Sequence, residues 1–109
     1  MTKYAARIAL KSLVQEGLVM RLDGILSEEG LLAKGEFYGV ESWSKTTERY
    51  PFVLLEDGDI DYGDWCDPPE RFMKSNFRKR FMRSGEIVTF DSEGGSHEYQ
   101  IIKVTRTTA

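Results

Sequence analysis

The sequence predicts a small α+β domain: an N-terminal helix, a short-stranded antiparallel sheet that curls into a small, partly open barrel, an internal helix and a C-terminal β-hairpin. Polar residues recur at helical spacing near the N-terminus, short apolar segments alternate with turn sequences in the middle, and a helix-start sequence precedes a basic segment. A chain of 109 residues is long enough for one hydrophobic core. Residues 1–109 are therefore expected to form a single domain.

The N-terminal helix is expected over residues 2–16. Four polar side chains recur at intervals of four residues: Lys3, Arg7, Lys11 and Gln15. Apolar residues and alanines occupy most positions between them, which is typical of a helix with one face in water. Gly17 is expected to end this helix.

The middle and the end of the chain are expected to form strands. The expected strands cover residues 18–22, 31–43, 51–56 and 59–62, with a final hairpin formed by 87–91 and 98–105. Asp23-Gly24 and Asp57-Gly58 are both typical of hairpin turns. Gly39 is expected to mark a β-bulge, because glycine inside a strand often does so.

The internal helix is expected from about residue 68 to residue 84, and Gly85 is expected to end it. Asp67 is suited to cap this helix, and Pro68 suits its first position. Three large apolar side chains recur at intervals of four and are expected to face the core: Met73, Phe77 and Phe81. The opposite face would then carry arginines and lysine together with two large apolar side chains.

That opposite face is the first candidate binding surface. Residues 71–83 contain six basic side chains and no acidic one. Basic and aromatic groups together can grip phosphates and stack on bases, and arginine, phenylalanine and methionine are also enriched in protein interfaces. The candidate partner-binding residues are Arg71, Phe72, Arg78, Lys79, Met82 and Arg83.

An acidic segment is the second candidate surface. Residues 56–70 contain seven acidic side chains and no basic one. The candidate interaction residues are Asp57, Asp59, Asp61 and Asp64. Their spacing begins like a calcium loop, but Tyr62 stands where that loop needs glycine and Pro68 where it needs glutamate. No metal site is therefore predicted.

No catalytic residue or cofactor is predicted either. His97 is the single histidine, and its chain neighbours would point away from it on a strand, so a surface position at the end of a turn is expected. Cys66 is the single cysteine, which excludes an internal disulfide and favours a reducing cytoplasm. The sequence has no phosphate-binding glycine loop.

Five aromatic residues spread through the strand region are expected to pack in the core: Tyr38, Trp43, Tyr50, Tyr62 and Trp65. If two or more of them shared an exposed face, that face would become a binding surface. The sequence leaves these alternatives open.

The expected function is that of a non-enzymatic protein-interaction module: a small adaptor, inhibitor or modulator with a protein partner. Its net charge of −3 and pI near 5.2 argue against a dedicated nucleic-acid binder, which is usually basic. The alternative is an RNA- or single-stranded nucleic-acid-binding domain that uses residues 71–83. No apolar run approaches the ~20 residues of a membrane span, so no membrane partner is expected. In general character the chain resembles small accessory proteins of phages and mobile elements.

Overall fold

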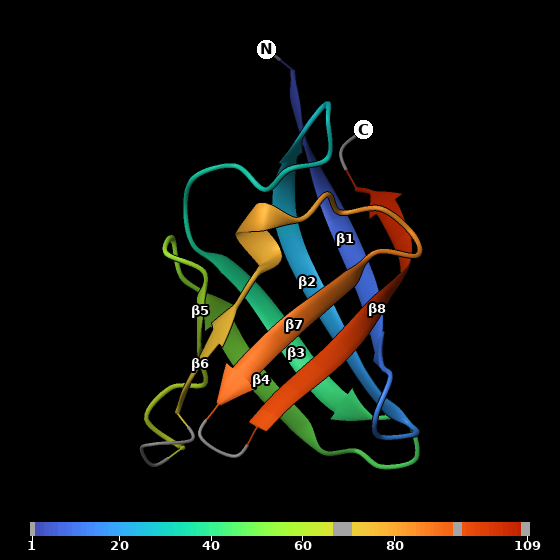
Figure 1. The fold of residues 1–109 in the computed structure, drawn as a ribbon, viewed down its shortest axis with the longest axis vertical. Coiled ribbons are helices and arrows are strands. Elements are labelled where there is room, and N and C mark those ends of the chain that lie inside the picture. The colour runs from blue at the N-terminus through green and yellow to red at the C-terminus, as the bar shows by residue number, and fades with distance from the viewer. Residues whose placement is uncertain (1, 67–70, 93–94, 108–109) are drawn as a thin grey trace.

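The fold is a closed antiparallel β-barrel, shown by a computed structural model that describes residues 2–66, 71–92 and 95–107 (Figure 1). The strands are β1 (Lys3–Ser12), β2 (Leu18–Ser27), β3 (Phe37–Trp43), β4 (Arg49–Leu54), β5 (Asp59–Asp61), β6 (Phe72–Ser75), β7 (Ile87–Ser92) and β8 (Gly95–Arg106). One turn of 3-10 helix, η1 (Phe77–Lys79), lies between β6 and β7. Each strand pairs with the next, and β8 pairs with β1. The predicted α+β class is therefore wrong.

The predicted N-terminal helix is the strand β1. Ala6, Ile8 and Leu10 point into the barrel and are buried, whereas Arg7 and Lys11 are exposed on its outer side. A spacing of four residues places side chains on one face of a helix, and it also places them on one face of a strand. Pairing with β2 on one side and β8 on the other gives β1 two ladders of hydrogen bonds, which an amphipathic helix would forgo.

The predicted internal helix is also wrong. Its first positions, 67–70, lie outside the described residues, and the chain then forms β6, η1 and an extended connection to β7. β6 pairs with both β5 and β7, so it closes the barrel and leaves neither neighbour with a free edge. Phe77 is fully buried, as the apolar stripe requires, but Phe81 is exposed.

The strand predictions succeed in part. The Asp57-Gly58 turn and the final hairpin are confirmed: Gly58 has a φ of +96° and donates to the Leu55 carbonyl at 3.0 Å. The Asp23-Gly24 turn is wrong, because both residues lie inside β2. The predicted bulge at Gly39 is wrong too, because pairing from Leu22 through Gly39 to Phe52 is in register. The observed irregularity lies between β1 and β8, at Ala9 and Leu10.

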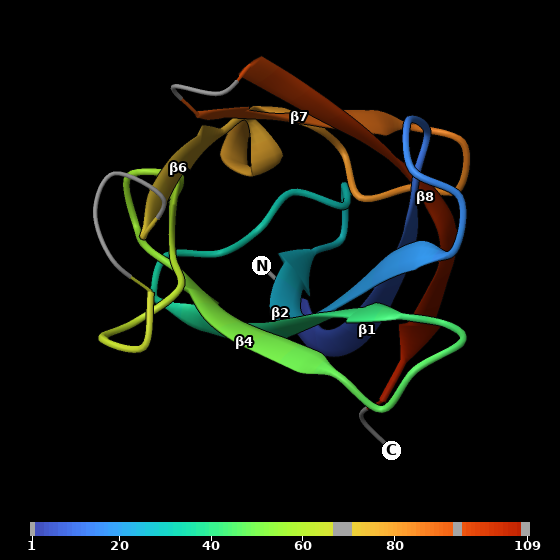
Figure 2. The same ribbon diagram turned by 90° about the horizontal axis from the view of Figure 1, so that it is seen from below.

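The upper end of the barrel in Figure 1 is closed by chain segments. The β2–β3 connection and η1 lie within the ring of strands when the barrel is viewed along its length (Figure 2). Phe77 and Met82 are buried in the core, and the Met82 amide donates to the Gly30 carbonyl at 2.7 Å. The described residues form no helix of the length and apolarity needed to cross a membrane.

Candidate ligand-binding site

The six predicted partner-binding residues do not form one surface, because the helix that would align them does not exist. Arg71 lies at the lower end of β6, where it binds Asp61 at 2.9 Å and Asp64 at 2.7 Å. Its guanidinium also lies 4.9 Å from the ring centre of Phe72, which is exposed. This pairing partly neutralises the acidic candidates, and it holds the pKa of Asp61 below its ordinary value.

The other four predicted partner-binding residues lie at the closed end. Arg78 donates hydrogen bonds to the carbonyls of the neighbouring connections, so it holds the end of the barrel together. Met82 is only 2% exposed and belongs to the core. Arg83 lies over the Phe81 ring and donates to the Glu29 carbonyl at 3.3 Å. Lys79 is exposed.

The remaining acidic candidates support the β4–β5 turn. The Asp57 carboxylate accepts a hydrogen bond from the Asp59 amide at 2.9 Å. Among the described residues, no group of three or more His, Cys, Asp or Glu side chains is placed to hold a metal ion.

The lower end of the barrel contains two adjoining cavities, of about 220 Å³ and about 250 Å³. They share three lining residues: Glu41, Tyr62 and Met73. The first cavity is also lined by Gln15, Leu18, Trp43, Phe90, His97 and Tyr99. The second cavity is also lined by Tyr50, Trp65 and Cys66. These residues come from β2, β3, β4, β6, β7 and β8 and from two of the connections at this end.

The alternation of side chains along β3 places a carboxylate inside the barrel. Phe37 and Gly39 are buried, and Glu41 and Trp43 follow them at steps of two residues on the same inner face. The same rule places His97 and Tyr99 inside on β8. His97 was expected at the surface, but it is partly buried and lines the first cavity.

Glu41 is the centre of a polar network in this otherwise apolar interior. The Tyr99 hydroxyl donates a hydrogen bond to a Glu41 carboxylate oxygen. Burial raises the pKa of Glu41 above its ordinary value, and the interactions with Tyr99, His97 and Tyr62 offset this rise only in part. Burial and the Glu41 charge both raise the pKa values of Tyr62 and Tyr99, so both phenols keep their protons at neutral pH.

Aromatic rings surround the mouth of the cavities. The rings of Tyr50 and Trp65 are stacked with centres 5.9 Å apart, and the Tyr62 ring meets Trp65 edge-on at 6.1 Å. Trp65 is 54% exposed. Three of the five aromatic residues singled out in the sequence therefore line the second cavity, and Trp43 lines the first. The fifth, Tyr38, lies on the outer face of β3.

Glu41 can accept hydrogen bonds or hold a proton, while the two phenols direct their protons at Glu41. His97 lines the same cavity as Glu41 and the two phenols. Comparisons with protein-family models, curated proteins and solved structures gave no match to this chain.

Proposed function

We propose that the protein binds a small organic molecule in the two cavities at the lower end of its barrel, without chemical turnover. The observation that carries this proposal is Glu41, a carboxylate inside a barrel whose other inward side chains are mostly apolar. Buried polar groups at a concave apolar site are typical of groups that orient a ligand. A barrel that served only as a packed scaffold would be more stable with an apolar side chain there.

The cavities set the size of the ligand. Each exceeds the ~150 Å³ of an engineered apolar cavity that holds benzene. Each is also smaller than the roughly 300–1,000 Å³ typical of sites for drug-sized molecules. A ligand with one ring and a short arm fits this range, and the stacked Tyr50 and Trp65 rings offer it a flat apolar wall.

Substitution of Met73 by tryptophan is expected to abolish binding of small aromatic compounds. Met73 lines both cavities and is partly buried, so a larger side chain would fill the site. Binding is measured by amide NMR in a screen of small aromatic compounds. Compounds that bind the wild type are expected to shift the amides of residues 41–43, 62–66 and 97–99, and to leave those of residues 30–35 and 77–83 unchanged.

Lys74→Trp is the matched control, because Lys74 is the next residue of β6 and its side chain is exposed. It adds the same indole outside the barrel and is expected to bind as the wild type does. Circular dichroism establishes that both variants are folded. Unchanged affinity in folded Met73→Trp would contradict the proposal.

A second candidate function, protein interaction, is supported by a groove on the outer face of β1–β4. The groove has a volume of about 510 Å³, and its lining includes Arg7, Arg21 and Arg49 but no acidic side chain. Tyr38 and Ile102 are 54% and 49% exposed in it. Asp23 pairs with Arg7 at 2.8 Å and lies 4.0 Å from Arg21, so it offsets one of the three positive charges. Arginine with aromatic and aliphatic groups is typical of protein interfaces, and the remaining positive charge favours an acidic partner. In this reading the interaction surface lies on the outer sheet and not on residues 71–83.

The double substitution Arg21→Glu/Arg49→Glu is expected to remove such a partner, because it reverses the charge of the groove. Capture from the lysate of the protein's own host, after nuclease treatment, compares this variant with wild type and with Lys79→Glu/Lys103→Glu, which alters exposed lysines outside the groove. A partner retained by the groove variant would contradict this assignment. We also propose that the protein resides in the cytoplasm.

A further inference from the structure

We infer that the ligand is an organic cation whose protonated nitrogen pairs with Glu41 and whose apolar body lies against Met73 and the aromatic rings of the mouth. This inference rests on the proposed ligand-binding function and names the chemical class of the ligand. Three features of the site carry it: the direction of the hydrogen bonds around Glu41, the lack of a lysine or arginine beside Glu41 among the described residues, and the charge and aromatic content of the lower end of the barrel.

The hydrogen bonds around Glu41 leave lone pairs of its carboxylate free to accept further hydrogen bonds. They leave no N–H or O–H group free to donate to a ligand there. Tyr99 donates to one carboxylate oxygen, and Tyr62 lies close enough to lower the pKa of Glu41. A carboxylate has about four lone-pair sites, so it can accept more hydrogen bonds than the one from Tyr99. A ligand at this point must therefore bring donors, and an ammonium group brings up to three.

In the described part of the chain, the Glu41 carboxylate forms no salt bridge with a lysine or an arginine. None of the ion pairs of the described residues includes Glu41, and no Lys or Arg lines either cavity. His97 supplies an attractive charge interaction, and burial opposes ionisation. A carboxylate taken from water needs a compensating charge, and a bound ammonium group supplies it where the structure has left it open.

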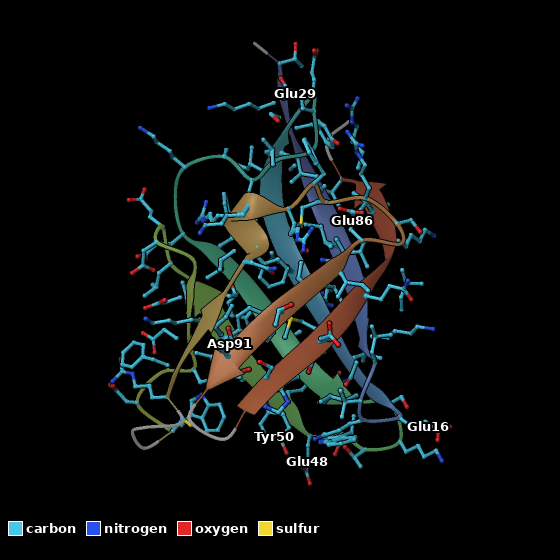
Figure 3. All side chains as sticks on the ribbon, in the orientation of Figure 1. Glu16, Glu29, Glu48, Tyr50, Glu86 and Asp91 are labelled. Carbon is cyan, nitrogen blue, oxygen red and sulfur yellow. The ribbon has the colours of Figure 1, made fainter. Side chains whose placement is uncertain are left out.

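The aromatic rings and the charge of the lower end both favour a cation. Aromatic faces attract cations within about 6 Å of the ring centre, tryptophan most strongly, and Trp65 and Tyr62 lie beside the second cavity. The described residues at this end (11–18, 41–49, 61–66, 71, 91 and 95–98) contain seven acidic and four basic side chains. Figure 3 shows Glu16, Glu48 and Tyr50 at this lower end. A net negative mouth attracts cations from solution.

The test uses three probes of similar size that differ in charge: 2-phenylethylamine, 2-phenylethanol and phenylacetate. Each is titrated into the wild-type protein and followed by amide NMR. The amine is expected to bind at least about tenfold more tightly than the alcohol, a difference of about 1.4 kcal/mol. Phenylacetate is expected to bind most weakly, because its charge repels Glu41.

Glu41→Gln is expected to remove the preference for the amine, so that the amine and the alcohol bind with similar affinity. The glutamine amide oxygen can still accept the hydrogen bond from Tyr99, so the wall of the cavity is kept. Glu16→Gln is the matched control: it removes the same charge at the same end, but Glu16 lines neither of the two cavities. It is expected to keep the preference, which separates a local contact from the general field.

The outcomes distinguish the inference from the function beneath it. If the alcohol or the anion binds at the mouth as tightly as the amine or more tightly, the ligand is not a cation. The proposed binding of a small molecule would still stand. A preference for the amine that survives Glu41→Gln overturns the role of Glu41. If neither these probes nor the wider aromatic screen shifts the amides at the mouth, both the inference and the proposed function fail. The comparison on wild-type protein does not depend on the folding of any variant.

Discussion

Arg78→Ala is expected to lower the free energy of unfolding by about 2–3 kcal/mol and Tm by roughly 10 °C. The Arg78 guanidinium donates to the carbonyls of Ala33, Gly35 and Leu55, at 2.5 Å for Ala33 and 3.1 Å for Leu55. These carbonyls belong to the β2–β3 and β4–β5 connections, so one side chain joins two loops to the segment after β6. Alanine would leave the partly buried carbonyls without this donor, which adds a desolvation cost to the lost bonds.

Lys79→Ala is the control for this prediction. Lys79 follows Arg78 in η1, and its side chain is exposed, so its loss is expected to change stability by no more than about 0.5 kcal/mol. Urea unfolding followed by tryptophan fluorescence measures both variants. Equal stability of the two would show that Arg78 does not hold the closed end together.

The error over β1 shows what the N-terminal pattern left undecided. The polar residues Lys3, Arg7 and Lys11 are four apart, which satisfies a helical face and a strand face equally. Ala6, Ile8 and Leu10 alternate with them, and this period of two was the better guide. Alanine has high helix propensity, but pairing with β2 and β8 outweighs that preference.

The error over residues 68–84 has a different cause. The spacing of Met73, Phe77 and Phe81 fits a helix, and a proline-containing helix start precedes it. β6 needs only four residues, from Phe72 to Ser75, to complete the barrel between β5 and β7. Closure of the barrel depends on all of its strands together, so no single segment of the sequence predicts it.

The candidate site could have been found in part from the sequence. Once residues 37–43 are read as one strand, alternation places Glu41 on the same face as Phe37, where a charged side chain is unusual. The partners of Glu41 could not be found in this way. Tyr99 lies 58 residues away along the chain, and only the closed barrel brings its hydroxyl to the carboxylate.

Gly39→Val is expected to destabilise the protein by about 3 kcal/mol or more, at the upper end of the range for overpacked cores. A Cβ atom at Gly39 would lie 2.3 Å from the Cζ atom of Phe52 and 2.9 Å from the carbonyl oxygen of Arg21. The Phe52 ring is only 2% exposed, and the carbonyl belongs to β2, which pairs with β3. Neither can move without loss of packing or of strand pairing. Thermal unfolding by circular dichroism measures the change.

Ser42→Val tests whether valine in β3 is itself the cause. Ser42 lies on the outer side of the same strand and is only partly buried, where a β-branched residue suits the strand. The free energy of unfolding of Ser42→Val is expected to stay within about 0.5 kcal/mol of that of the wild type. If Gly39→Val were equally well tolerated, the close packing of the Phe52 ring over β3 would be contradicted.

A double-mutant cycle connects this packing to the ligand site. Phe52→Leu removes the ring that meets the new Cβ atom, so Gly39→Val is expected to cost less in that background than alone. The Phe52 ring also meets Tyr62 edge-on, with centres 5.9 Å apart, and Tyr62 lines both cavities. A valine that displaces Phe52 should therefore weaken 2-phenylethylamine binding even under conditions where the variant is folded. Gly39 would then serve the site by leaving room for the ring that positions Tyr62 beside Glu41.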